Sequence, residues 1–287
     1  MTSHLLPRIY YTVQGFQRRW RSATWAISIG IWLGVLSRSA LDEIDDIYYL
    51  VRRGKQSSPI DYRSDEHNER GLREWEREVI EKYFDKKGRL AVLGAGGGRE
   101  VLALKQLGFE VEGWECQEEL ASSANRLLTT MGFEPTVSVY PRDTCPRGDP
   151  CFSGIIVGWG VYTHMNGSQG RIALLRAIRE RLLQGSPILL SFFSRDQAAL
   201  MYDLTARVAN ILRLIARREH VEVGDFLGPN FVHFFTESEV RCELEAAGFT
   251  LSMYRARPVA HAIATPTPSL NPSSLARSRS GPPKAAA

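Results

Sequence analysis

From residue 71 onward the chain alternates between two hydrophobic patterns. Short apolar runs of four to seven residues are typical of buried strands, and between them apolar residues recur every three or four positions, as in helices. The runs predict strands at residues 90–93, 109–114, 136–140, 152–158, 187–193, 231–235 and 249–254. Helices are predicted at residues 71–84, 100–107, 118–131, 170–183, 198–217 and 237–247. This alternation predicts an α/β fold with a doubly wound, mostly parallel seven-stranded sheet.

Upstream of this region, residues 22–37 form a long uncharged stretch of 16 residues. That is fewer than the roughly 20 residues that a membrane-crossing helix needs. Four of its apolar residues fall on one helical stripe: Trp25, Ile29, Trp32 and Leu36. The stripe predicts a helix that packs on the body of the protein or on a partner, such as a second copy in a homodimer. A helix that lies on a membrane surface is the alternative.

The domain organisation follows from these patterns and from a change in composition. Residues 1–70 are predicted to be a helical extension that caps the domain, with a second helix at residues 40–50 and a loop at residues 54–59. The α/β domain is predicted to cover residues 71–258. Residues 259–287 are rich in Pro, Ser and Ala and poor in large apolar side chains. Such a segment cannot offset its ordering entropy by burial, so it is predicted to be disordered.

The formal net charge of +4 comes from the two ends of the chain. Residues 1–41 carry five Arg and no acid, and residues 259–287 carry three bases and no acid. The remainder holds 28 bases and all 32 acids, a net of −4. A nucleic-acid-binding domain usually carries its bases on a folded face. The charge pattern therefore favours a mildly acidic domain with basic extensions, and no nucleic-acid partner.

The four cysteines, at positions 116, 145, 151 and 242, show no CxxC spacing. No metal site is predicted from them, and reduced thiols in a cytoplasmic protein are the expected state. His233 lies inside the apolar run FVHFF and is predicted to be a core residue rather than a base.

The segment VLGAGGGRE, residues 92–100, leaves an apolar strand and opens a helix. Glycines there permit a tight turn and a close approach of a ligand to the backbone, and the helix start offers free N–H groups. A dinucleotide fingerprint would need glycine or alanine at position 99, which is Arg99. The spacing G-x-G-x-G, with Gly94, Gly96 and Gly98, fits completely.

This spacing resembles the first motif of class I S-adenosylmethionine-dependent methyltransferases, and the resemblance extends over roughly residues 70–258. In that family an acid at the end of the second strand binds the ribose hydroxyls, and Glu115 stands there. A further acid after the third strand lies near the adenine amino group, and Asp143 stands there. The resemblance implies a Rossmann-like methyltransferase fold and S-adenosylmethionine as cofactor. The implied binding residues are Gly94, Ala95, Gly96, Gly98, Arg99, Glu115, Asp143 and Gly158, with Arg99 near the methionine carboxylate.

The chain departs from the family pattern at two positions. Val92 replaces an acid that is frequent two residues before the first glycine, and Ser153 replaces an Asp that is frequent after the fourth-strand Phe. The Asn/Asp-Pro-Pro-Tyr/Phe motif is also missing after the fourth strand. Its absence argues against methylation of amino groups on bases or glutamine.

Methyl transfer needs a positioned nucleophile and, for a hydroxyl, a group that removes its proton. Tyr162 and His164 follow the fourth predicted strand, at the edge of the sheet where ligands bind, and are the candidate catalytic residues. A solvated loop is the alternative for His164. Trp159 is predicted to fill the core rather than to stack on a substrate. His67, Asn68 and Arg70 could line the site, although a polar loop is the simpler interpretation.

These observations predict a cytoplasmic methyltransferase that acts on a small molecule. A non-catalytic S-adenosylmethionine-binding protein, whose N-terminal helices bind a partner or a membrane surface, is the first alternative. A nicotinamide-linked oxidoreductase is the second alternative, and Arg99 disfavours it.

Overall fold

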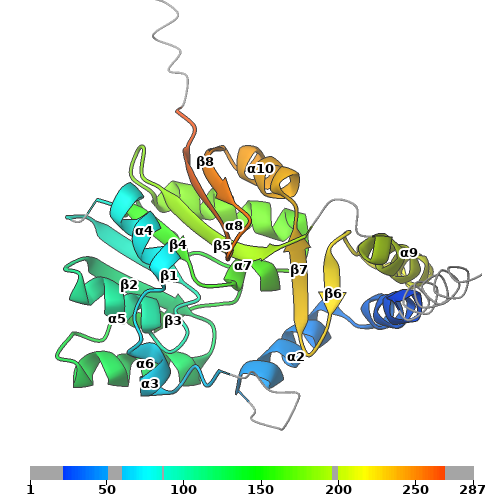
Figure 1. The fold of residues 1–287 in the computed structure, drawn as a ribbon, viewed down its shortest axis with the longest axis horizontal. Helices are drawn as coiled ribbons and strands as arrows, with labels where there is room; N and C mark the ends of the chain where they lie inside the picture. Colours follow the sequence, from blue (N-terminus) through cyan, green and yellow to red (C-terminus); the bar gives the residue numbers. More distant parts are fainter. Residues whose placement is uncertain (1–21, 51–59, 86, 196–199, 269–287) are drawn as a thin grey trace, which may run out of the picture.

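The computed structural model describes residues 22–50, 60–85, 87–195 and 200–268 (Figure 1). Its strands are β1 (Arg89–Leu93), β2 (Glu110–Glu115), β3 (Val137–Val139), β4 (Gly154–Val157), β5 (Ile188–Ser194), β6 (Asp225–Leu227), β7 (Phe231–Phe235), β8 (Phe249–Arg255) and β9 (Ala260–Pro266). After the N-terminal helix (Ser22–Val35) come α2 (Arg38–Leu50), α3 (Asp65–Asn68), α4 (Glu74–Tyr83), α5 (Arg99–Gln106), α6 (Glu118–Thr130), α7 (Val161–His164), α8 (Ser168–Arg181), α9 (Leu200–Ile215) and α10 (Glu237–Ala246). Every helix and strand predicted on the described residues is present, within a few positions.

The sheet is doubly wound and mostly parallel, as predicted. Strands β3, β2, β1, β4 and β5 lie side by side in that order, all parallel. Beyond β5 the sheet divides. Residues 188–192 of β5 pair antiparallel with β9, which pairs with β8, whereas Phe193 and Ser194 pair parallel with β7, which pairs with β6. The sheet therefore has nine strands, and the prediction of seven is wrong.

Strands β6 and β9 were not predicted because their side chains give a weak apolar signal. β6 has only three residues, DFL, and β9 reads AHAIATP. The alanines of β9 at positions 260, 262 and 264 are nevertheless buried, and its backbone pairs with strands on both sides. Backbone hydrogen bonds to β5 on one side and to β8 on the other hold β9 in the sheet, although its side chains are small. The domain thus extends to Pro266, and residues 260–266 are not disordered; residues 269–287 and the predicted loop 54–59 lie outside the described residues.

Both faces of the sheet are covered by helices. Leu90 and Val92 of β1 point into a cluster with α4, α5 and α6, while Ala91 and Leu93 point into a second cluster with α8 and α10. Full burial on both faces explains why the parallel strands read as continuous apolar runs. It also leaves the carboxyl edge of the strands as the place where a ligand can reach the sheet.

The N-terminal helix packs on the body of the protein through only part of the predicted stripe. Ile29 and Leu33 are buried, whereas Trp25 and Trp32 are 57% and 56% exposed. Of the predicted stripe, Ile29 and Leu36 pack on the body, whereas the two tryptophans stay largely exposed. The reason lies in the small residues of this helix, which sit opposite α9.

Gly30 and Gly34 let the N-terminal helix approach α9 closely. A Cβ on Gly30 would lie 2.7 Å from the carbonyl oxygen of Thr205, and one on Gly34 would lie 2.8 Å from Leu212. Small residues four apart allow such contact between helix backbones. Arg213 of α9 then donates to the carbonyl of Leu33 at 2.8 Å, so the end of the helix is capped from α9.

Among the described helices, none alone has the length and apolar composition to cross a bilayer. The N-terminal helix and α2 pass that test only as a pair, across a bend of 114°. The second member of this pair, α2, runs over the carboxyl edge of the sheet. There the buried carboxylate of Asp45 accepts a hydrogen bond from the N–H of Phe231 at 3.0 Å.

Candidate functional site

A large cavity opens at the carboxyl edge of β1, β2 and β4, roofed by α2 and residues 60–73. Its volume is about 1160 Å³ counting the open mouth. A concave cavity at the carboxyl edge of an α/β sheet is where such folds bind small molecules. Seven of the predicted site residues line it: Gly94, Ala95, Gly96, Arg99, Glu115, Asp143 and His164.

The glycine loop forms the floor of the cavity. Gly94 and Gly96 have φ values of 71° and 54°, which favour glycine, and a Cβ on Gly94 would lie 2.4 Å from Val161. The N–H groups of Gly94 and Ala95 donate to the carbonyl of Trp114 at 2.8 and 3.1 Å. These bonds fix the loop against the end of β2.

Two predicted binding residues, Gly98 and Gly158, do not line the cavity. Gly98 precedes α5 with a φ of 95°, and a Cβ there would lie 3.0 Å from Ala124 of α6. A Cβ on Gly158 would lie 2.5 Å from the carbonyl oxygen of Gly94. Both glycines therefore permit close packing around the loop, and the structure does not place them with the other predicted binding residues in the cavity wall.

Gly97 lines the cavity, although it was not predicted. A Cβ at this position would lie 1.8 Å from the carbonyl oxygen of Tyr62 and 2.4 Å from the amide nitrogen of Asn68. Asn68 also donates to the carbonyl of Tyr62 at 2.8 Å. The segment around α3 thus rests directly on the glycine loop, and His67 and Asn68 are cavity residues rather than a free polar loop. The extra glycine in GAGGG was the available signal.

The two predicted acids stand at the edge of the cavity. Glu115 ends β2 and is buried; its carboxylate accepts from the N–H of Gly96 at 2.7 Å and of Gln117 at 3.0 Å. Asp143 forms an ion pair with Arg38 at 3.1 Å. Burial raises the pKa of Asp143 above its usual value, although Arg38 and Arg142 oppose the rise.

The guanidinium of Arg99 is committed to other side chains. It forms two 2.7 Å bonds to the carboxylate of Glu76, a 2.6 Å bond to Glu100 and a 2.8 Å bond to the carbonyl of Gly71. Burial alone would lower its pKa, but Glu100 and Glu76 raise it above the usual value. Arg99 therefore joins α5 to α4, with none of these bonds directed at a ligand.

Arg73 offers a different guanidinium to the cavity. Its Cζ lies 4.2 Å from the ring centroid of Trp159, and both residues line the cavity. Across the part of the chain that the structure describes, no carboxylate lies within ion-pair distance of Arg73. Trp159 was predicted to fill the core, so its place in the cavity wall is a correction.

His164 faces the cavity from α7 and contacts Tyr49 of α2. Its Nδ1 lies 2.9 Å from the carbonyl oxygen of Phe231, and its Nε2 lies 2.8 Å from the hydroxyl of Tyr49. Because a carbonyl can only accept, Nδ1 carries the proton and Nε2 accepts from Tyr49. Burial lowers the pKa of His164 to about 4 and raises the pKa of Tyr49 well above its usual value. The pair is neutral at pH 7, and no local pattern around Tyr49 indicates that it belongs to this pair.

Tyr162, the other candidate catalytic residue, lies in the core. Its side chain is 0% exposed, stacks on Phe235, and donates a 2.5 Å hydrogen bond to Glu243. It does not line the cavity. The first turn of α7 points Tyr162 inward and His164 toward the cavity, so the catalytic prediction for Tyr162 is corrected.

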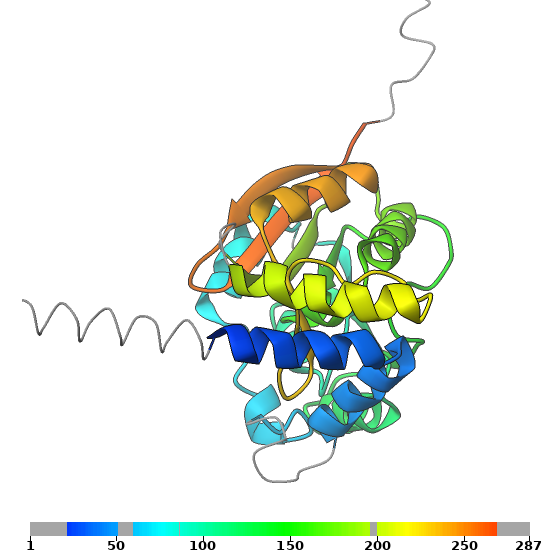
Figure 2. The ribbon, with the colours of Figure 1, turned by 90° about the vertical axis from the view of Figure 1, so that its right-hand side faces the viewer.

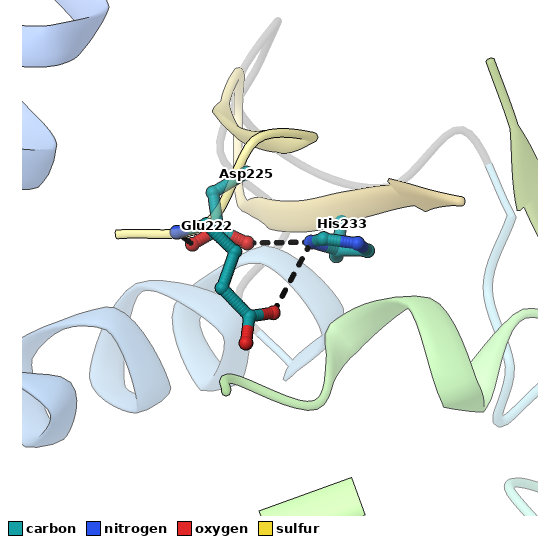
Figure 3. A group of neighbouring side chains, drawn as sticks. All are labelled: Glu222, Asp225 and His233. Atoms are coloured by element: carbon teal, nitrogen blue, oxygen red, sulfur yellow. Dashed lines mark hydrogen bonds and ion pairs between the residues drawn. The ribbon is translucent and has the colours of Figure 1, made fainter. Parts of the chain in front are cut away.

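One group of metal-ligand types occurs in the described chain, away from the cavity: Glu222, Asp225 and His233 (Figure 3). The Nδ1 of His233 lies 2.7 Å from Asp225 and 3.8 Å from Glu222. Arg171 donates to Glu222 at 2.6 Å. Burial raises the pKa of Glu222, but Arg171 and Ser168 together lower it to about 2. These bonds describe a buried ion-pair network, and His233 is a core residue, as expected.

No protein-family profile matches the chain, and no curated protein matches it. Solved structures do match. An S-adenosylmethionine-dependent methyltransferase from Methanosarcina mazei shares 18% identity and a TM-score of 0.55, over 69% of this chain and 99% of that chain. The CcbJ methyltransferase from Streptomyces caelestis shares 14% identity and a TM-score of 0.52, over 78% and 96%. A sugar N-methyltransferase from Streptoalloteichus shares 15% identity and a TM-score of 0.50, over 68% and 86%. The chain has the class I methyltransferase fold.

Proposed function

We propose that this chain is an S-adenosylmethionine-dependent methyltransferase that acts on a small molecule. One observation carries the proposal: the glycine loop, the Glu115 carboxylate and the neutral His164–Tyr49 pair all line a single cavity. Groups that can bind the cofactor and a group that can accept a proton therefore lie in one cavity, as a methyl-transfer reaction requires.

The residues of the cavity fit the parts of S-adenosylmethionine. The two carboxylate oxygens of Glu115 suit a ribose diol, which offers two hydroxyl donors. Asp143 would lie near the adenine amino group. The guanidinium of Arg73 suits the amino-acid carboxylate, and we assign it that role in place of Arg99, whose bonds go to Glu76, Glu100 and Gly71. The small residues at positions 94–97 leave space for the cofactor on the loop.

The alternative dinucleotide has less support. Where a dinucleotide fingerprint needs a glycine or alanine, this chain has the buried and paired side chain of Arg99.

When bound, S-adenosylmethionine supplies a methyl group on a positively charged sulfur, ready for displacement by a nucleophile. The protein's task is then to hold the acceptor in line and to take its proton. We propose that Tyr49 accepts a hydrogen bond from the acceptor while its own proton moves toward Nε2 of His164. The carbonyl of Phe231 holds the ring in the required tautomer.

The acceptor side of the cavity is aromatic, with Tyr49, Tyr62 and Trp159 in its wall. Aromatic faces suit the apolar face of a sugar or a planar ring. A sugar N-methyltransferase is among the structures of similar fold. We therefore propose an acceptor with a hydroxyl or amino group on a ring. The cytoplasmic location stays a prediction.

The experiment is a transfer assay with methyl-tritiated S-adenosylmethionine and a panel of amino sugars and phenols. We expect acceptor-dependent formation of S-adenosylhomocysteine, which the His164→Ala variant reduces. Tight binding of S-adenosylmethionine without transfer to any acceptor would favour the non-catalytic alternative instead.

A further inference from the structure

The exposed large apolar side chains of this protein gather on two helices. Within the described residues, nine of the fifteen lie on the N-terminal helix and α9: Trp25, Ile27, Ile31, Trp32, Val35, Leu200, Ile211, Leu214 and Ile215. Leu214 and Ile215 are 73% and 77% exposed. Soluble proteins rarely expose apolar side chains so close together unless the patch binds something. We call these nine residues the two-helix face.

The two helices form one continuous surface. They run parallel, because Ala26 contacts Thr205 near their starts and Leu33 contacts Arg213 near their ends. Figure 2 shows them side by side on the outside of the molecule, with the sheet behind them. Their glycines and alanines are used for contact with each other, which turns the large apolar residues outward. The face is thus a fixed part of the fold.

The charges that accompany the two-helix face are predominantly basic. Arg207, Arg217 and Arg218 are exposed on α9 or just after it, and Glu219 is the exposed acid beside them. The N-terminal helix carries no charged residue, and the first 41 residues of the chain contain five Arg and no acid. A partner that complements this face would offer negative charges to the arginines and an apolar layer to the nine exposed apolar side chains.

We propose that the two-helix face docks on the surface of a bilayer that contains anionic lipid. Exposed Trp25 and Trp32 suit the interface between headgroups and acyl chains, where an indole has both an apolar body and an N–H donor. The apolar residues would enter the boundary layer while the arginines contact lipid phosphates. A second copy of the chain fits less well, because a symmetric dimer would bring the same arginines face to face.

The test is sedimentation of the full-length chain with phosphatidylcholine vesicles and with vesicles that also contain phosphatidylglycerol. We expect binding to the anionic vesicles, a blue shift of tryptophan fluorescence, and loss of binding as salt rises. The double variant Trp25→Ser/Trp32→Ser should lower vesicle affinity about tenfold or more, and Arg207→Gln/Arg217→Gln should lower it about tenfold. Both pairs are largely exposed, but the Trp25 ring also contacts Phe226 at 5.4 Å, so thermal unfolding is measured on each variant and the vesicle result is read only for folded protein.

The matched control is Leu107→Ser/Met131→Ser, at two exposed apolar positions that follow α5 and α6. This variant should bind vesicles like the wild type. Failure of the wild type to bind anionic vesicles would overturn the proposal. So would self-association in sedimentation velocity that Trp25→Ser/Trp32→Ser abolishes, because the occupant would then be a second copy.

Discussion

The floor and the roof of the cavity are held in different ways. The floor, made by the ends of β1 and β2, is fixed by backbone bonds such as those from Gly94 and Ala95 to Trp114. The roof, made by α2 and residues 60–73, is fixed by side-chain contacts between distant segments. Tyr49 and His164 are 115 residues apart in the chain, and Asp45 and Phe231 are 186 apart.

This difference teaches where each property of the site resides. Backbone hydrogen bonds hold the glycine loop of the floor in a single conformation. Adding a side chain to a glycine of this loop should therefore abolish cofactor binding. The roof is held in place by a few polar contacts. Removing any one of them should change ligand affinity, reaction rate or protein stability by a limited amount. The following predictions separate these effects, starting with the largest.

The largest effect is expected for Gly96→Asp in the floor. The substitution puts a side chain at a φ of 54° and a carboxylate beside Glu115, where the cofactor's ribose would lie. Calorimetry should detect no binding of S-adenosylmethionine. The control is Gly108→Asp, which has a φ of 89° and open space but lies at the far end of α5, away from the cavity. If both variants lose binding equally, backbone strain and not the floor would be the cause.

Where the roof contacts α7, Tyr49→Phe and His164→Ala should lower kcat by about 10²–10⁴ while the cofactor still binds, because general-base catalysis contributes that much. Since burial holds the pKa of His164 near 4, the wild-type rate should stay on its plateau when the pH falls from 7 to about 5. An unperturbed histidine at pKa about 6.5 would instead lose activity over that range.

The control for this pair is Tyr162→Phe. It removes the buried bond to Glu243 and should lower the free energy of unfolding by about 1–3 kcal/mol. Its kcat should match the wild type. A loss of kcat with unchanged stability would return Tyr162 to the catalytic machinery.

Arg73→Ala should weaken S-adenosylhomocysteine about 10–100-fold, the usual range for one hydrogen bond to a charged group. It should leave 5′-methylthioadenosine, which lacks the amino-acid carboxylate, unchanged. Equal weakening of both ligands would mean that Arg73 only supports the cavity wall through Trp159.

The smallest effect is a pH-dependent change of stability at Asp45. Burial raises its pKa to about 7, so the folded carboxyl keeps its proton over a range where the unfolded chain has released it. The unfolded state then binds fewer protons, and stability falls as the pH rises from about 4 to 7. Asp45→Asn should therefore gain a few degrees in Tm over the wild type between about pH 5 and pH 8. Glu43→Gln, at an exposed acid on the same helix, should show no such gain.

The floor was the part that sequence could predict. Glycines with positive φ, an acid at the end of β2 and buried strands leave local marks, and Gly94, Gly96, Glu115 and Asp143 all line the cavity as predicted. Even there, spacing could not tell a glycine that faces the ligand from Gly98, which only permits helix packing.

The roof could not be predicted, because its contacts join segments whose relation depends on the whole fold. Helical periodicity identified the N-terminal helix but only part of its buried face, since Gly30 and Gly34, rather than the two tryptophans, lie against α9. The pairing of Tyr49 with His164 has no local signal. Strand β9 likewise depends on its neighbours more than on its own side chains.

The central claim is that this cavity binds S-adenosylmethionine. Its most direct test is calorimetric titration of the wild-type, full-length chain with S-adenosylmethionine, S-adenosylhomocysteine and NAD in separate experiments. We expect both sulfur nucleosides to bind at a single site with micromolar affinity, about −8 kcal/mol, and NAD to give no heat of binding. Binding of NAD without binding of either sulfur nucleoside would contradict this claim.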